Sequence, residues 1–295
     1  MTVNLNAAAS FLATHARVLE RRRFELLTGE VIPQAVLGAV EGYRNADGGY
    51  GWGLEPDLRA PESQPGGALH AFEVFEQIAP ATTPLAAELC DWLTSVSLPG
   101  GGLPFAFPVA DPAGCAPFWT QAVPTFSLQS TAFVAGTALR VAAHDGAVAE
   151  HPWLAEATRT CIEAIRRIDS APHAIELSFA IRFLDAAHAT RPEAAELLDH
   201  LGKFLPDNGI LHVAGGSAEE FMRPLDFAPN PGPARRLFDD RAVERELDDL
   251  EAGQQDDGGW PVVFASYSPA ATLEWRGYTT VNAIRVLNAN SRVTW

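Results

Sequence analysis

The sequence predicts an all-α protein built from repeated helix pairs, and three observations support this prediction. A glycine-containing turn recurs along the chain, and the apolar residues between the turns follow the helical period of about 3.6 residues. No segment shows the apolar–polar alternation of a half-buried strand. Hydrophobic residues make up 47% of the 295 residues and charged residues 20%, which is sufficient for a packed core.

The recurring turn closes each helical stretch. Four copies are recognisable: Asp47-Gly48-Gly49-Tyr50, Gly100-Gly101-Gly102-Leu103, Asp207-Asn208-Gly209-Ile210 and Asp257-Gly258-Gly259-Trp260. The closing apolar residues are separated in order by 53, 107 and 50 positions, so the middle interval holds two periods. Ser170-Ala171-Pro172 is the expected degenerate copy. Glycine or asparagine supplies the positive φ that ends a helix, and the aspartate accepts backbone N–H bonds.

About ten helices are predicted from this periodicity, at roughly 7–28, 33–45, 66–79, 84–97, 127–144, 151–168, 172–189, 192–204, 239–253 and 277–289. Proline at positions 33, 84, 152, 172 and 192 lies near five of the starts, where it costs no hydrogen bond. The remaining segments at 51–65, 103–125, 211–237 and 261–275 are predicted to be long loops, and loops of this size are usually functional. The regular repeat predicts that they emerge on one face.

The charge balance excludes some partners. Twenty-one basic against 37 acidic side chains give a net charge of −16, which argues against binding to nucleic acid or to an anionic membrane. No apolar stretch approaches the roughly 18 residues of a membrane span, and no basic residues precede the apolar patch near the N-terminus as in a secretion signal. Cys90, Cys115 and Cys161 are far apart and suggest neither a disulfide framework nor a zinc knuckle. We therefore expect a cytoplasmic protein without stable membrane insertion.

The segment from Gln254 to Trp260 fits the pattern Gln-x-x-x-Gly-x-Trp. It resembles the repeat of squalene–hopene and other terpenoid cyclases and of protein prenyltransferase β subunits. The copy at the first turn is similar, with Arg44 in the Gln place and Tyr50 in the Trp place. Segments 124–132 and 275–280 also resemble the starts of inner helices in that family. The resemblance implies a single domain over 1–295, an (α/α) toroid of about five to six helix pairs around a ligand cavity.

The family's best-known chemical motifs are absent. At the place of the Asp-x-Asp-Asp motif, which protonates an alkene in class II cyclases, this chain has Ser127-Leu128-Gln129-Ser130. Asp248 and Asp249 follow the helical period onto the charged face of their helix, so we expect them to face solvent. No cysteine lies near a histidine as a prenyltransferase zinc site requires, and Cys115 lacks the neighbours of a thioester. The eight histidines show no metal spacing and are expected to be ordinary surface or core residues, so no metal or other cofactor is implied.

Carboxylates in the long loops are the candidate proton donors. Asp57 and Glu62 lie in a proline-rich segment with Glu55 and Arg59 as candidate substrate contacts. A structural alternative is an Asp57–Arg59 pair, with Glu55 capping a helix.

Asp226 is the third candidate, and two settings are open for it. One is a solvated loop position, and the other is an apolar setting between Leu225 and Phe227, where desolvation raises the pKa of a carboxyl group as a general acid requires.

Aromatic side chains gather in the same loops. The candidate substrate-binding residues are Trp52, Glu55, Arg59, Phe105, Trp119, Phe227, Trp260, Glu274, Trp275 and Arg276. Ring faces suit a polyprenyl chain and stabilise a carbocation by about 0.5 to 2 kcal/mol per contact. The same rings also suit sugar stacking or ordinary core packing, and Gln254 and Trp260 also fit a purely structural role.

Three functions follow as hypotheses. The first is a terpenoid-cyclase-like enzyme that cyclises or isomerises an isoprenoid or isoprenoid-derived, hydrophobic small molecule by proton transfer. The second is a carbohydrate-active glycosidase or lyase with paired carboxylates. The third is a noncatalytic ligand-binding toroid. A diphosphate substrate with Mg²⁺ is not indicated, because Asp239-Asp240 is too short for an aspartate-rich motif and is expected to cap its helix.

Overall fold

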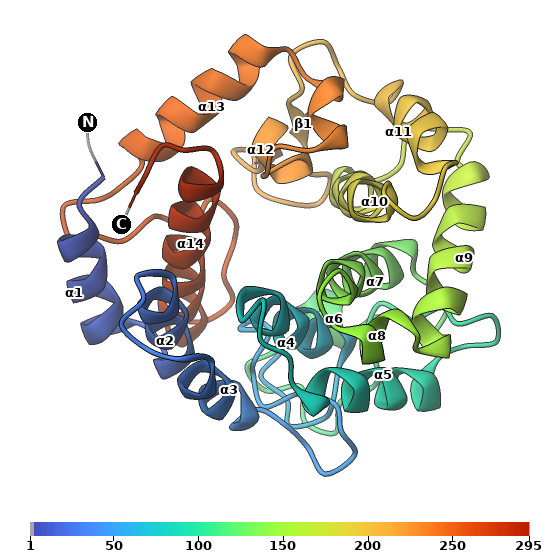
Figure 1. Cartoon of the computed structure of the whole chain (residues 1–295), viewed down its shortest axis with the longest axis horizontal. Coiled ribbons are helices and arrows are strands. Elements are labelled where there is room, and N and C mark those ends of the chain that lie inside the picture. The colour runs from blue at the N-terminus through green and yellow to red at the C-terminus, as the bar shows by residue number, and fades with distance from the viewer. Residues whose placement is uncertain (1–2, 295) are drawn as a thin grey trace. The chain divides into compact units, whose positions relative to one another are not determined.

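The computed structural model describes residues 3–294, which are mostly helical (Figure 1). The α-helices are α1 (Leu5–His15), α2 (Val18–Leu27), α3 (Pro33–Glu41), α4 (Pro65–Gln77), α5 (Pro84–Val96), α6 (Pro117–Thr120), α7 (Leu128–Ala142), α8 (Gly146–Ala149), α9 (Pro152–Arg166), α10 (Ala174–Ala187), α11 (Ala194–Gly202), α12 (Pro224–Phe227), α13 (Asp240–Ala252) and α14 (Pro269–Ala289). A 3₁₀ helix spans Pro233–Leu237, and β1 (Leu211–His212) pairs antiparallel with β2 (Phe221–Met222). The all-α prediction is confirmed.

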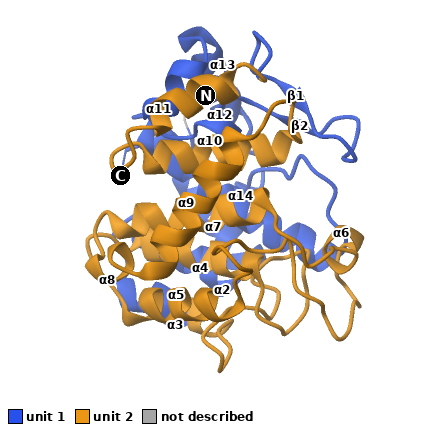
Figure 2. Cartoon of the chain, turned by 90° about the vertical axis from the view of Figure 1, so that its right-hand side faces the viewer, with its two compact units in different colours: residues 1–39, 205–295 blue, residues 40–204 orange. Residues whose placement is uncertain are grey.

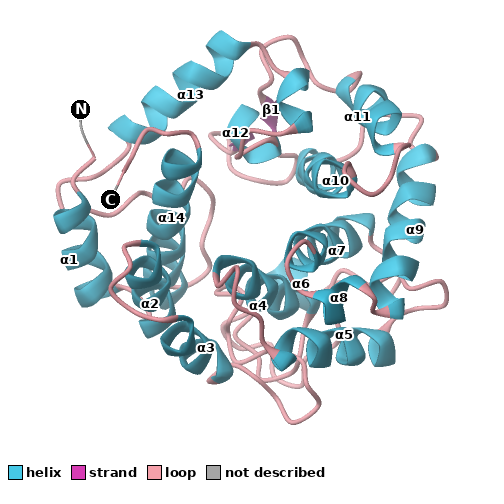
Figure 3. Ribbon diagram, in the orientation of Figure 1, coloured by secondary structure: helices cyan, strands magenta, loops and turns pink. Residues whose placement is uncertain are grey.

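Two predicted elements differ in extent. The stretch 7–28 is two helices rather than one, because Ala16 and Arg17 adopt extended backbone between α1 and α2. Helix α14 begins eight residues before the predicted position 277, since the Ser268 hydroxyl accepts the Ala271 N–H at 3.0 Å and Pro269 fits the first turn. Trp275 and Arg276 therefore lie on a helix and not in a loop. Long loops remain before α4 and between α5 and α7 (Figure 3). The predicted loop at 211–237 instead contains β1, β2, α12 and the 3₁₀ helix.

The chain divides into two compact units (Figure 2): residues 1–39 with 205–295, and residues 40–204. In the second of these, α4, α7 and α10 pack against one another. Phe133 and Phe179 meet edge to face at 5.1 Å, and Arg140 on α7 binds Glu76 on α4 at 3.0 Å. A Cβ at position 136 would lie 3.1 Å from the Phe183 Cα, so Gly136 allows α7 to approach α10 closely.

The unit of residues 1–39 and 205–295 has its own core. Its fully buried members include Phe11 of α1, Ile284 of α14, and Trp260, which precedes α14 in the chain. On α13, Asp239 caps the first turn as expected, accepting the Arg241 N–H at 2.9 Å. Asp248 lies on the exposed face and binds Arg292 at 2.9 Å, which confirms that this acidic string is a solvated surface.

The glycine turns share one geometry. Gly48 and Gly258 have φ values of 92° and 93°, in the left-handed region. Asp47 accepts the Gly49 N–H at 2.9 Å, and Asp257 accepts the Gly259 N–H at 3.0 Å. Between α11 and β1, Asn208 accepts the Ile210 N–H at 3.1 Å in the same two-residue pattern. The predicted turn chemistry is therefore confirmed.

Three of the glycine turns, and the segment beside the degenerate copy, are also bonded to a later or earlier helix within their own unit. The turn at 44–50 binds α5 through an Arg44–Glu88 ion pair, and the turn near Gly100 accepts a hydrogen bond from Thr160 of α9. The carbonyl of Ile168, beside the degenerate copy, accepts a hydrogen bond from His200 of α11 at 2.7 Å. The turn near Gln254 binds the start of α1 (below). The repeat is therefore visible in hydrogen bonds as well as in sequence.

Candidate functional site

An imidazole held between two carboxylates forms a buried ionic group within residues 40–204. His70 and Glu73 share one face of α4, where residues three apart are neighbours, and Glu55 approaches from the preceding loop. The His70 Nδ1–Glu73 Oε2 distance is 3.0 Å, and the His70 Nε2–Glu55 Oε2 distance is 3.1 Å. All three residues are buried, with exposed fractions of 4%, 5% and 8% for His70, Glu73 and Glu55. One carboxylate on each ring nitrogen favours the doubly protonated imidazolium.

The carboxylates decide the protonation state of the ring. Burial by itself lowers the pKa of His70, because a charged ring is costly in a low-dielectric interior. The hydrogen bonds to Glu55 and Glu73 and the charges of these groups outweigh that effect and raise the pKa of His70 to about 9. The ring is therefore a cation at neutral pH.

The loop before α4 places Glu55 beside the helix. Glu55 Oε1 accepts the Asp57 N–H at 3.2 Å, which fixes the carboxylate relative to its own loop. At the start of α4, a Cβ on Gly67 would lie 2.2 Å from the Tyr50 carbonyl oxygen. Only glycine at position 67 lets the helix begin directly against the first glycine turn, and this close approach brings His70 within reach of Glu55.

Aromatic side chains lie next to the side chain of Glu55. Trp119 stacks on Phe105 with ring centroids 4.6 Å apart, and Phe118 adds a tilted contact to Trp119 at 5.5 Å. A Cβ on Gly66 would meet both Glu55, at 3.4 Å, and the Trp119 ring, at 3.6 Å, so these two side chains lie over the same point of α4. Trp119 is only 8% exposed and packs in an apolar cluster with Leu58, Ala60, Ala106 and Ala116. A charged group and an apolar surface thus adjoin.

Other residues of this loop lie elsewhere. Asp57 is 3% exposed, and its carbonyl accepts the Ala116 N–H at 2.8 Å, which joins two loops. Arg59 is half-buried beside Gly53 and Gly114.

Glu62 and Trp52 contact a different set of groups. Glu62 Oε1 accepts the Ala110 N–H at 3.0 Å. Trp52 is 59% exposed, has a positive φ of 57°, and donates its indole N–H to Asn45 at 2.7 Å. The structure therefore brings Glu55, Phe105 and Trp119 together and does not place Trp52 with them.

Asp226 has the solvated setting, one of the two that the sequence left open. Its side chain is exposed, and its carboxylate accepts the Arg223 N–H at 2.8 Å at the start of α12. Leu225 and Phe227 flank it in sequence, but neighbouring side chains point in different directions on a helical turn. Phe227 is fully buried and packs against Phe238 with centroids 5.7 Å apart, so it is a core residue.

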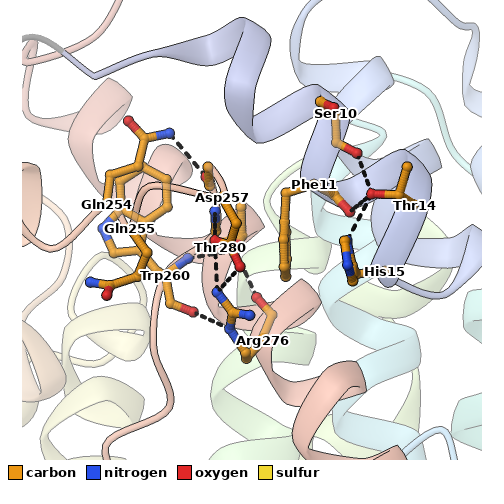
Figure 4. Close-up of polar contacts among 12 residues, drawn as sticks. Ser10, Phe11, Thr14, His15, Gln254, Gln255, Asp257, Trp260, Arg276 and Thr280 are labelled. Carbon is orange, nitrogen blue, oxygen red and sulfur yellow. Dashed lines mark hydrogen bonds and ion pairs between the residues drawn. The ribbon is translucent and has the colours of Figure 1, made fainter.

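Trp260 and Arg276 make interlocking contacts in the unit of residues 1–39 and 205–295 (Figure 4). Trp260 is 2% exposed, donates its indole N–H to the Leu250 carbonyl at 2.7 Å and its backbone N–H to the Thr280 hydroxyl at 3.0 Å. The Arg276 guanidinium lies 4.5 Å over the Phe11 ring and binds Asp257 at 2.9 Å. Desolvation by itself raises the pKa of Asp257. Hydrogen bonds from the Gly259 N–H and from Arg276 outweigh this effect and hold that pKa below its usual range.

Glu274 and Trp275 precede Arg276 on α14. Glu274 lies 3.9 Å from Arg17, which also binds the fully buried Glu20 at 2.7 Å. Trp275 packs edge to face on Phe264 and Tyr278 at 5.2 and 5.3 Å. These contacts join α14 to the start of α2 and to the loop that precedes α14.

The sequence interpretation missed His70 and Glu73 and treated the histidines as ordinary. The available signal was a histidine and a glutamate three apart inside an otherwise apolar helical stretch, because charged side chains there need a partner. Within residues 3–294, no set of three His, Cys, Asp or Glu side chains has the geometry of a metal site. None of the helices in this range is long and apolar enough to cross a membrane. A scan against protein-family models and a search of curated proteins each returned no match.

Proposed function

We propose that this chain is a terpenoid-cyclase-like enzyme that transfers a proton at a carbon atom of an isoprenoid or isoprenoid-derived substrate, and that Glu55 is the group that carries the proton. The observation that supports this most is the buried Glu55–His70–Glu73 group beside the Trp119 and Phe105 rings. The (α/α) toroid belongs to the same proposal. The hydrogen bonds that join three of the glycine turns to a helix of another repeat support it.

The arrangement suits proton transfer to or from an apolar substrate. In the protonating direction, the His70 imidazolium gives its Nε2 proton to the Glu55 carboxylate, and the alkene π pair takes that proton from the Glu55 carboxyl. A C–H bond forms, which leaves a carbocation on the substrate and a neutral His70 ring. Aromatic faces stabilise such a cation in a dry site. The cation then loses a different proton to Glu55, or is captured by water that gives a proton to Glu55, and this proton passes to His70 and restores the imidazolium. Glu73 keeps the ring positioned and compensates its charge.

Glu55 takes the place of Asp57, Glu62 and Asp226, the three carboxylates that the sequence suggested as proton donors. Asp226 is exposed and is not enclosed by apolar groups. The Glu62 carboxylate is bound to the Ala110 N–H, a backbone group that does not give up its proton. Glu55, which the sequence suggested as a substrate contact, has a proton source at 3.1 Å in His70 Nε2.

Paired-carboxylate sugar chemistry is less well supported. Glycosidases place their two carboxyl groups about 5 to 9.5 Å apart on either side of the scissile bond. Here the His70 ring occupies the space between Glu55 and Glu73, where that bond would have to lie. No contact in this group favours a glycosidase.

The test is turnover of a panel of polyprenes, both free alcohols and hydrocarbons and their diphosphates, in D₂O with mass-spectrometric analysis of the products. We expect a new cyclised or isomerised product that carries deuterium at one carbon. Glu55→Gln should lower the rate by about 10²- to 10⁴-fold, the usual contribution of a general acid–base group. Glu150→Gln, an exposed glutamate in the same unit, is the matched control. Products without deuterium, full activity of Glu55→Gln, or ligand binding without turnover would each refute this assignment.

A further inference from the structure

A groove of about 450 Å³ lies within residues 40–204 and shares no lining residue with the Glu55–His70–Glu73 group. Its wall combines two carboxylates, Asp47 and Glu62, with the rings of Trp92 and Phe107. Prolines 61 and 108 also line it. No lysine or arginine does. The volume falls in the range of sites for small organic ligands, which is about 300 to 1,000 Å³.

Glu62 carries an unused acceptor in this wall. Its Oε1 atom accepts the Ala110 N–H at 3.0 Å, whereas its Oε2 atom is buried and has no hydrogen-bond partner among the described residues. The neutral N–H of Ala110 does not compensate the charge of this carboxylate, so Glu62 adds a negative charge to the wall of the groove.

Asp47 adds a second carboxylate at the exposed rim. Its Oδ1 atom accepts from the Gly49 N–H and from the Ser63 hydroxyl, at 2.9 and 2.8 Å. Its Oδ2 atom accepts the indole N–H of Trp92 at 3.2 Å. These donors are neutral, so they orient the carboxylate without compensating its charge.

The aromatic part of the wall is held in place independently of any ligand. Trp92 is 3% exposed, and its ring meets that of Phe107 at 6.2 Å with an angle of 83° between the planes. The backbone of Phe107 is clamped by the buried Gln64, whose side-chain amide accepts from the Phe107 N–H at 2.8 Å and donates to its carbonyl at 3.1 Å. The two rings are therefore preorganised.

We propose that this groove binds a small organic cation of the alkylated ammonium type. Two carboxylates without a basic partner in the wall attract a cation, and the half-buried ring of Phe107 adds a cation–π contribution. Methylated ammonium groups suit aromatic and proline walls because they are weakly hydrated and present apolar methyl groups. A bare metal ion does not match a groove of this size lined by two rings.

The test compares choline with 3,3-dimethylbutan-1-ol, which has the same shape without the charge, by calorimetric titration of the whole chain. We expect choline to bind saturably, at least about tenfold more tightly than the neutral alcohol, and less tightly as salt is added. This comparison uses the unmodified protein, so it needs no variant to fold.

Variants then locate the site. Glu62→Gln should weaken choline binding by about tenfold or more, whereas Glu150→Gln should leave it unchanged. Phe107→Leu keeps both carboxylates and should also weaken choline binding. Circular dichroism melting curves check that each variant is folded. Equal binding of the neutral alcohol, unchanged affinity in Glu62→Gln, or a Kd for choline above about 10 mM would overturn the proposal. None of these readouts depends on turnover, so they are independent of the proposed activity.

Discussion

The side-chain amide of Gln254 closes a double hydrogen bond with the backbone of Asn4, a residue 250 positions earlier in the chain. Gln254 Oε1 accepts the Asn4 N–H at 2.8 Å, and Gln254 Nε2 donates to the Asn4 carbonyl at 2.9 Å. Nε2 also donates to the Gly258 carbonyl at 2.9 Å. One side chain thus joins the last glycine turn to the start of α1.

Removing this amide should destabilise the unit of residues 1–39 and 205–295. Gln254→Ala loses three hydrogen bonds at a partly exposed site, so we expect the free energy of unfolding to fall by about 1 to 3 kcal/mol. Gln255→Ala is the control, because the side chain of Gln255 is exposed and binds only the Gly253 carbonyl. Urea denaturation measures both. Equal losses in the two variants would show that the bond to Asn4 contributes nothing.

In two of the turns, the hydroxyl of a buried threonine accepts a backbone N–H of the turn. Thr280 accepts the Trp260 N–H and Thr131 accepts the Leu103 N–H, both at 3.0 Å, and all four residues are buried. Valine has nearly the same shape but leaves the N–H unpaired. We expect Thr280→Val and Thr131→Val each to lower the free energy of unfolding by about 1 to 3 kcal/mol.

The control for these variants is Thr279→Val, because Thr279 is only partly buried and lies next to Thr280 on the same helix. Urea denaturation at one pH compares the three variants with the unmodified protein. A loss in Thr279→Val as large as that in Thr280→Val would contradict the role of the hydroxyl.

His70 should make stability depend on pH. The folded pKa of about 9 lies above the ordinary value of 6.5, so the charged ring stabilises the fold fully below pH 6.5 and progressively less as pH rises through 9. The gap corresponds to about 3 kcal/mol at most. Denaturant titrations at pH 6, 7.5 and 9.5 measure this loss.

The comparison protein for that experiment is His70→Gln, which should lack this part of the pH dependence. Burial raises the pKa of the Cys90 and Cys161 thiols, so ionisation of these cysteines in the unfolded chain adds a loss above pH 8 in both proteins. The difference between the two curves isolates His70. Parallel curves would show that the ring is not held as a cation.

The sequence predicted local structure well where one residue type has one physical role. Aspartate followed by glycine at 47–48 and at 257–258 demands the turn that the structure shows. The site was harder to predict, because sequence spacing does not say which loop residue meets which helix. Glu55 and His70 are neighbours only because Gly67 lets α4 start against Tyr50, a contact that depends on tertiary packing. For Asp226 the sequence left both settings open, since apolar neighbours in sequence are not necessarily apolar surroundings in space.

Gly67 should be among the least replaceable glycines of the chain. A Cβ at this position would lie 2.2 Å from the Tyr50 carbonyl oxygen and 3.2 Å from the Tyr50 Cβ, and both atoms belong to a buried turn. Gly67→Ala must push α4 away from the turn, so we expect a loss of about 2 kcal/mol or more in the free energy of unfolding.

The shift of α4 should also separate His70 from Glu55, because one residue is on the helix and the other is in the loop. Gly67→Ala should therefore lower the pKa of His70, which NMR titration of the imidazole measures directly. The matched substitution is Gly38→Ala in α3, where a Cβ meets no atom within 4 Å. That change should stabilise the protein by up to about 1 kcal/mol, because alanine favours a helix more than glycine does. A Gly67→Ala protein with unchanged stability and an unchanged His70 pKa would show that the close approach does not position the site.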